Sequence, residues 1–146
     1  ILQGLSKDGG RSFAPSVPVP DTDAPGNRGW EAVGPGPGGR VFAAWLDHRK
    51  LAAQSQAPAG HQHAGHEAGA SAPAAAAAPA DGVAMAQLSQ LYVGAVDGSV
   101  PPRPVTGGVC YCCKTALVTG PGDVVYVAWR HVYPGNMRDI AFSASR

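Results

Sequence analysis

Two stretches of this chain repeat one pattern. Residues Ala32–Trp45 (AVGPGPGGRVFAAW) align without a gap on residues Ala116–Trp129 (ALVTGPGDVVYVAW). In each copy, a short strand precedes a Gly-Pro-Gly turn, and a strand rich in β-branched and aromatic residues follows it, so each copy is predicted to form a β-hairpin. Repetition of one β-unit is typical of propellers and solenoids. The chain is therefore predicted to be all-β, with repeated antiparallel units.

The composition agrees with a chain of strands and turns. It has 20 Gly and 14 Pro among 146 residues, which favours many turns and few helices. The formal net charge is +1 and the basic residues are scattered, so we expect no nucleic-acid partner. No apolar run approaches the ~20 residues that cross a bilayer, so we expect no membrane span. The chain begins inside a strand-like run without Met and stops inside another, so we expect the remaining units in a longer parent chain.

The segment Leu5–Phe13 (LSKDGGRSF) has the residues of a closed hairpin turn. The side chains of Ser6 and Asp8 can accept hydrogen bonds from nearby backbone N–H groups, and Gly10 suits the positive φ of a tight turn. Phe13 is expected to begin the return strand and to pack inward. The spacing of Ser6, Asp8, Gly10 and Phe13 resembles the Asp-box, the hairpin signature of the sialidase-like (BNR-repeat) β-propellers. An ordinary Asp-Gly hairpin is the alternative interpretation.

The resemblance implies that the chain is a propeller fragment, about two and a half blades of antiparallel sheet. Residues 1–20 then form the outer hairpin of one blade, residues 29–106 a second blade, and residues 107–146 a truncated third blade. Ala95–Gly98 (AVDG) lies where the second blade would carry its Asp-box, without the Ser and the aromatic residue. The expected strands are near Trp30–Gly34, Arg40–Asp47, Gln90–Val96, Arg103–Thr106, Cys113–Thr119, Val124–His131 and Asp139–Ser145.

An Ala/Pro/His-rich insertion interrupts the second blade from about Leu51 to Val83. Its Pro and Gly residues break up any helix, and it has no apolar stripe, so it is predicted to be a disordered surface loop. The following segment, Ala84–Leu91, either adds a turn of helix or lengthens the third strand, and the pattern leaves both open.

Polar residues follow the Trp in both copies of the repeat. Arg130–Asp139 joins two strands of its blade, and Asp47–Lys50 follows the Trp of the other copy. Arginine suits bidentate recognition of a carboxylate, so a glycan or an anionic small molecule is the expected ligand. The expected ligand-binding residues are Arg130, His131, Tyr133, Asn136, Arg138, Asp139, Asp47, His48 and Arg49. Alternatively, these loops are polar because they are exposed, and their Arg and Asp residues pair with one another.

The resemblance also implies a more specific alternative. Sialidases bind the substrate carboxylate with three arginines and use an Asp as acid/base and a Tyr–Glu pair as nucleophile. Arg49 and Arg138 are of the first type. Asp47 is of the acid/base type and Tyr133 is of the nucleophile type. None of these residues lies in a sialidase motif, however, and the Phe/Tyr-Arg-Ile-Pro stretch that usually carries the first arginine is absent. The leading hypothesis is an exported ligand- or glycan-binding module, periplasmic or secreted. An exo-sialidase-type glycoside hydrolase is the alternative, with no catalytic set assigned.

The three cysteines lie together in residues 110–113 (CYCC), directly before an expected strand. If this segment is extended, Cys110 and Cys112 lie on one side and Cys113 on the other. One interpretation is disulfide bonding in an exported protein, with a partner Cys beyond Arg146. The other is a copper or zinc site, which makes extracytoplasmic metal binding the second alternative function. The histidines of the insertion either add to such a site or belong to a low-complexity linker. The candidate metal ligands are Cys110, Cys112, Cys113, His61, His63 and His66.

Overall fold

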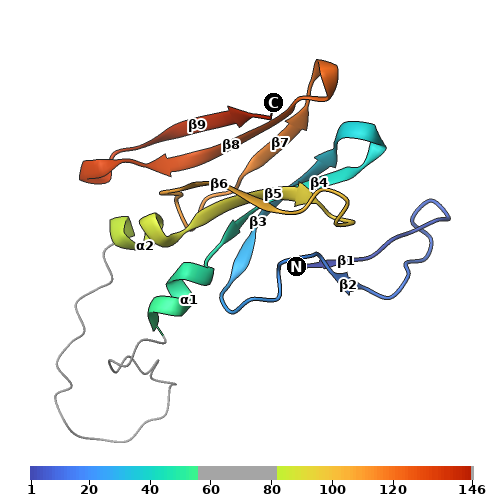
Figure 1. Ribbon diagram of the computed structural model, residues 1–146, viewed down its shortest axis with the longest axis horizontal. Helices are drawn as coiled ribbons and strands as arrows, with labels where there is room; N and C mark the ends of the chain where they lie inside the picture. Colours follow the sequence, from blue (N-terminus) through green and yellow to red (C-terminus); the bar gives the residue numbers. More distant parts are fainter. Residues whose placement is uncertain (56–81, 146) are drawn as a thin grey trace, which may run out of the picture.

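The computed structural model describes residues 1–55 and 82–145 of the chain, and these residues form three antiparallel sheets (Figure 1). The sheets have the strand orders β1-β2, β3-β4-β5-β6 and β7-β8-β9. The architecture is mostly antiparallel β-sheet, as predicted, and the described residues do not close into a barrel or a propeller. The elements are β1 (Leu2–Gln3), β2 (Val17–Pro18), β3 (Arg28–Pro35), η1 (Pro37–Gly39), β4 (Val41–Asp47), α1 (Arg49–Ser55), α2 (Gly82–Leu88), β5 (Gln90–Ala95), β6 (Arg103–Gly107), β7 (Ala116–Thr119), η2 (Pro121–Asp123), β8 (Val125–Val132), η3 (Pro134–Asn136) and β9 (Arg138–Ala144).

The repeated sequence forms the same hairpin twice. The first copy is β3–η1–β4 and the second is β7–η2–β8. Even the register agrees, since Ala32 pairs with Ala44 and its counterpart Ala116 pairs with Ala128. The predicted hairpins are therefore confirmed.

A glycine before each turn makes room for an aromatic ring of the following strand. A Cβ added to Gly36 would collide with the ring of Phe42, and one added to Gly120 would lie 2.8 Å from the ring of Tyr126. Because Gly36 and Gly120 occupy equivalent positions in the two copies, the glycine and the aromatic residue form a repeated packing pair.

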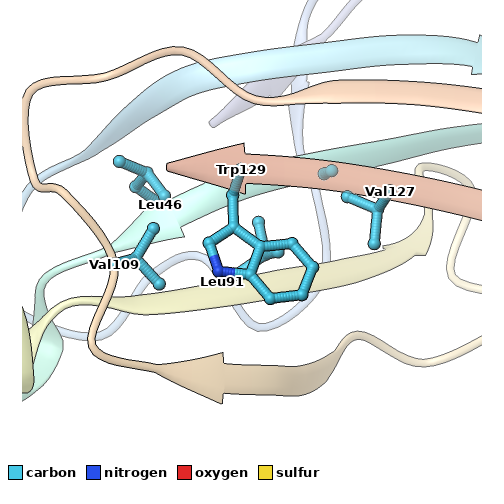
Figure 2. Packing of buried hydrophobic residues seen from close by; sticks show 6 residues of the cluster. Leu46, Leu91, Val109, Val127 and Trp129 are labelled. Carbon is cyan, nitrogen blue, oxygen red and sulfur yellow. The ribbon is translucent and has the colours of Figure 1, made fainter. Parts of the chain in front are cut away.

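The second and third sheets pack face to face around the main core (Figure 2). Side chains alternate along a strand, so Ala44 and Leu46 face the third sheet, whereas Trp45 faces the other way and stacks on Tyr92. Figure 2 shows the indole of Trp129 against Leu91, with Leu46 and Val109 beside them. The core residues are Ala44, Leu46, Leu91, Val109, Val127 and Trp129.

The two repeated tryptophans have equivalent surroundings. Trp45 is fully buried, and Ile1 from the N-terminal segment packs against its cluster. Trp129 packs on Leu46 and Leu91 of the second sheet. Each Trp thus faces the unit that precedes it in the chain, as expected when successive sheets stack in one direction.

The outer face of the third sheet is open. Phe42 of the second sheet is covered by Leu117 and Val125, but its counterpart Tyr126 lies on the open face. On the adjacent strand β9, Ile140 and Phe142 are 69% and 74% exposed. The third sheet therefore exposes the same kind of apolar face that the second sheet buries.

The side chains of Ser6 and Asp8 close the N-terminal turn by accepting hydrogen bonds from the backbone, as predicted. The Oγ of Ser6 accepts the N–H of Gly10 at 2.8 Å, and the Oδ1 of Asp8 accepts the N–H of Ser12 at 3.0 Å. The hydroxyl of Ser12 also donates to Asp8, and these bonds hold the pKa of that carboxyl far below its ordinary value. The prediction for Phe13 is wrong, because the turn is longer than expected, the return strand is β2, and Phe13 is exposed.

The turn after β5 is also closed by an aspartate that accepts hydrogen bonds from a nearby serine, but it is shorter. The Oδ1 of Asp97 accepts both the N–H and the hydroxyl of Ser99, at 2.9 and 2.6 Å. The hydroxyl bond is the main cause of the lowered pKa of Asp97. A carboxylate can therefore close this turn without the Ser of the full Asp-box.

Both ends of the predicted insertion are helical, which corrects its predicted bounds. Helix α1 contains Leu51, and α2 contains Val83. Residues 49–55 (RKLAAQS) lack Pro and Gly, and α2 packs Ala86 against Cys110. The segment Ala84–Leu91, for which the sequence pattern allowed helix or strand, is helical as far as Leu88, and β5 begins at Gln90. The remainder of the insertion, with all three of its histidines, lies outside the described residues.

Among the residues that are described, no helix is long and apolar enough to cross a membrane.

Candidate metal centre

The cysteine segment is a turn and not a strand. The N–H of Cys113 donates to the carbonyl of Cys110 at 3.2 Å, and the strand predicted to start at Cys113 begins only at Ala116. The end of β8 holds this turn in place, because the N–H of Cys110 donates to the carbonyl of Arg130 at 2.9 Å. Just before the turn, Gly108 has a φ of +70° and leaves no space for a Cβ beside the ring of His131.

The turn gathers the three thiols that an extended chain would separate. The Sγ atoms of Cys110 and Cys113 are 3.0 Å apart, and those of Cys110 and Cys112 are 3.6 Å apart. All three Sγ atoms lie within 4.8 Å of one another. Cys110 is buried, Cys113 is half-buried and Cys112 is exposed, and no disulfide joins them. Cys113 would face away from the other two only in an extended segment, and residues 110–113 form a turn instead.

The thiols differ in how readily they ionise. Burial by itself raises the pKa of Cys110, but hydrogen bonds from Cys113 and Cys112 and the charge of Arg138 outweigh it and hold that pKa below its ordinary value. The pKa of Cys112 is raised, mainly by its hydrogen bond with Cys110. The first negative charge of the cluster therefore lies on Cys110, and its neighbours donate to it.

Two arginines of the predicted ligand segment flank this cluster. The Nη1 of Arg130, in β8, lies 3.8 Å from the Sγ of Cys113. The Nη1 of Arg138, at the start of β9, lies 3.9 Å from the Sγ of Cys110. The charge of Arg138 is one of the causes that lower the pKa of Cys110 and so favour its thiolate form.

The other predicted residues of this segment contact one another. The ring of His131 packs edge-on against Tyr133, with ring centres 4.5 Å apart. The Oδ1 of Asn136 accepts a hydrogen bond from the Nε of Arg138 at 3.1 Å. The carboxylate of Asp139 is exposed and accepts the N–H of the next residue. These contacts lie in and beside the β8–β9 turn, between the strands that carry the two arginines.

The predicted ligand-binding residues at the end of β4 and just after it, Asp47, His48 and Arg49, have two different kinds of surroundings. The buried carboxylate of Asp47 accepts hydrogen bonds from the Nε of Arg28 at 3.0 Å and from the Nη2 of Arg49 at 2.8 Å. Arg49 also pairs with Asp21 at 3.1 Å. Asp47 and Arg49 therefore form the pairing that was the alternative to ligand binding. His48 instead lines a cavity beside the cysteine turn.

This cavity has a volume of about 900 Å³ and brings together residues that the sequence pattern does not single out. Arg28 and Trp30 come from the start of β3, and the sequence pattern predicts a strand only from Trp30 onward. Lys114 comes from the segment after the cysteine turn. Their proximity depends on how the second and third sheets pack, and no local motif reports it.

The chain matches no protein-family model, no curated protein and no solved structure.

Proposed function

We propose that this protein binds one soft metal ion, Cu(I), through Cys110, Cys112 and Cys113. The observation that carries the proposal is the position of the three Sγ atoms, all within 4.8 Å of one another on a single turn. Thiolate sulfur is a soft ligand, and among single metal ions it suits Cu(I) and Zn(II). A turn of four residues that presents three thiols to one point is a compact chelate for such an ion.

The spacing of the sulfur atoms suits three-coordinate binding. Metal–thiolate bonds of about 2.3 Å in a planar trigonal site require sulfur atoms about 4 Å apart. The shortest separations here are 3.0 and 3.6 Å, so the thiols need to move apart only slightly. The exposed Cys112 has the most freedom to make this adjustment.

Charge and ligand number favour Cu(I) over Zn(II). Structural zinc sites normally have four protein ligands, and the described residues bring only three Cys, His, Asp or Glu side chains together here. Three thiolates and one Cu(I) carry a net charge of −2. Arg130 and Arg138 together balance that charge at distances of 3.8 and 3.9 Å from sulfur.

The test is a titration of the reduced 146-residue chain with Cu(I) under anaerobic conditions, in competition with a coloured chelator such as bicinchoninate. We expect one tightly bound Cu(I) per chain and an X-ray absorption spectrum with sulfur neighbours at about 2.3 Å. Equilibrium dialysis with Zn(II) should show weaker binding. Absence of Cu(I) binding to the reduced protein overturns the proposal.

Two variants locate the metal. Cys110→Ser should abolish binding of Cu(I), whereas the triple variant His61→Ala, His63→Ala, His66→Ala should retain it. The opposite result would place the metal on the histidines of the insertion. The disulfide interpretation makes a different prediction, because two of the cysteines would then resist alkylation until a reductant is added.

The Asp-box resemblance supports the rest of the hypothesis, an exported propeller-type module that is periplasmic or secreted. Glycan binding by the Arg130–Asp139 segment and exo-sialidase activity stay predictions. Turnover of a fluorogenic sialoside by the parent protein, lost in Arg138→Ala, would support the enzyme. The ion pairs of Asp47 and Arg49 do not favour that function.

A further inference from the structure

The cavity beside the cysteine turn has the size of a ligand site. Its volume of about 900 Å³ falls in the range of small-molecule pockets, roughly 300–1,000 Å³. The first residues of β3, His48, helix α1 and the cysteine turn contribute to its lining.

The first feature is a buried guanidinium nitrogen. The side chain of Arg28 is only 5% exposed. Its Nε donates to Asp47, and its Nη1 donates to the carbonyls of Ala24 and Gly26. Its Nη2 is buried and has no hydrogen-bond partner in residues 1–55 and 82–145. Buried polar atoms are nearly always hydrogen-bonded, so this unpaired N–H group is an exception that a bound acceptor would satisfy.

A second buried nitrogen without a partner comes from the other side of the same hairpin. His48 follows β4, and its Nε2 is buried and lacks a partner within the described part of the chain. Burial lowers the pKa of His48, with the charge of Asp47 opposing this and that of Arg28 reinforcing it. The neutral ring can donate or accept one hydrogen bond at Nε2. Two residues of the cavity lining, Arg28 and His48, therefore each carry a buried nitrogen without a hydrogen-bond partner among the described residues.

The third feature is a strained aromatic residue. Trp30 has a φ of +57°, which is rare for a bulky side chain, and it lies where the register of β3 and β4 shifts. Its carbonyl accepts a hydrogen bond from the hydroxyl of Thr115 at 2.8 Å. Bulges and strained residues of this kind are concentrated at binding sites, where they redirect a side chain. Here the strain places an indole, 43% exposed, in the lining of the cavity.

We propose that this cavity binds a small organic acid with one carboxylate and a ring-shaped body. The carboxylate accepts hydrogen bonds from the Nη2 of Arg28 and from His48, and the ring packs on the indole of Trp30. Lys114 adds a positive charge to the lining, whereas Glu31 adds a negative one, so the lining as a whole favours a single negative charge. The proposed anion-binding groups, Arg28 and His48, do not belong to the thiol cluster, so ligand binding in the cavity does not require a bound metal.

The probe is glucuronate, and the matched probe is glucose, which lacks the carboxylate. Isothermal titration and tryptophan fluorescence with the metal-free chain should show glucuronate binding and at least about tenfold weaker glucose binding. Equal affinity for the two sugars, or no binding of glucuronate, overturns the proposal. Stronger binding of inorganic phosphate than of glucuronate would also overturn it, because it would mean that the ring is not recognised.

Three variants assign the contacts. Arg28→Lys keeps a positive charge for Asp47 but removes Nη2, so glucuronate affinity should fall at least about tenfold. Trp30→Phe should remove most of the ligand-dependent fluorescence change. His48→Gln should weaken glucuronate binding and leave glucose unaffected, and it keeps the test decisive if Arg28→Lys fails to fold. Arg11→Gln, in the exposed Asp-box turn, is the control and should bind like the parent chain. Unchanged glucuronate affinity in both Arg28→Lys and His48→Gln refutes the assignment.

Discussion

The indole Nε1 of Trp30 donates a hydrogen bond to the carbonyl of Tyr111 at 2.9 Å. Trp30 belongs to the second sheet, and Tyr111 is the middle of the cysteine turn. This contact joins the cavity lining to the thiol cluster and fixes the cysteine turn on one side, while β8 fixes it on the other side through Cys110. The two proposed sites therefore share one structural support while using different ligating atoms.

Arg138→Gln should weaken Cu(I) binding without abolishing it. The guanidinium lies 3.9 Å from the Sγ of Cys110 and contributes by charge, not by direct ligation. Exposed charge pairs contribute up to about 1 kcal/mol, so a loss of about fivefold in affinity is expected, and smaller at high salt. Competition titration at two salt concentrations measures this. Arg11→Gln should have no effect, and equal losses for both variants would argue against a local role.

Asp47→Asn should destabilise the fold strongly. The carboxylate is fully buried and pairs with both Arg28 and Arg49, so its removal leaves the buried Arg28 without its counter-charge. Breaking a buried pair in this way costs about 3–5 kcal/mol. Urea unfolding measures the loss. Asp21→Asn removes only an exposed partner of Arg49 and should cost less than about 1 kcal/mol, so similar losses in the two variants would contradict this account.

Gly36→Ala should cost more stability than Gly120→Ala, although the two positions are equivalent. The new methyl group meets Phe42 in one copy and Tyr126 in the other. Phe42 is buried and cannot move aside, so overpacking should cost about 1–3 kcal/mol, whereas the partly exposed Tyr126 can shift. Thermal unfolding should rank the two variants in that order. Gly29→Ala is the control, because nothing lies within 4 Å of its added Cβ.

Acidification should destabilise the protein in two steps. The pKa of His48 is lowered from 6.5 by burial, so the unfolded chain binds its proton first and stability falls as the pH drops below about 6.5. The pKa of Asp47 is also lowered from 3.8. Burial alone would raise it, but hydrogen bonds from Arg49 and the charges of both arginines outweigh that, so a second loss follows below about pH 3.8. Urea midpoints across this range should show both steps, and His48→Gln should lack the first.

The open face of the third sheet should make the chain self-associate. Ile140 and Phe142 project from a face whose counterpart in the second sheet is covered, and exposed apolar faces of this kind mark contact surfaces. Sedimentation velocity should show concentration-dependent association of the parent chain. Ile140→Lys with Phe142→Lys should remove it, and Phe13→Lys, at another exposed aromatic residue, should not. A strictly monomeric parent chain would refute this prediction.

Features encoded over short distances could be predicted from the sequence. A hairpin needs only a Gly-Pro-Gly turn between two β-forming runs. The sequence shows the turn and the runs directly in Ala32–Trp45 and in Ala116–Trp129. The turn closed by Asp8 is likewise specified within a few residues. Phe13 was assigned to the core wrongly because the length of a turn and the sheet that covers it are not local properties.

The sequence by itself therefore determined the strands, the repeated turns and the presence of three adjacent thiols. The packing of the second sheet on the third decided how those thiols lie relative to one another. Hydrogen bonds from Cys110 to β8 and from Trp30 to Tyr111 bend residues 110–113 into a turn, which brings the three sulfur atoms together. The same packing buries Arg28 with one nitrogen unpaired, because Asp47 and two carbonyls fill only part of its hydrogen-bonding capacity. Both effects depend on contacts between segments far apart in the chain, which no local pattern of residues encodes.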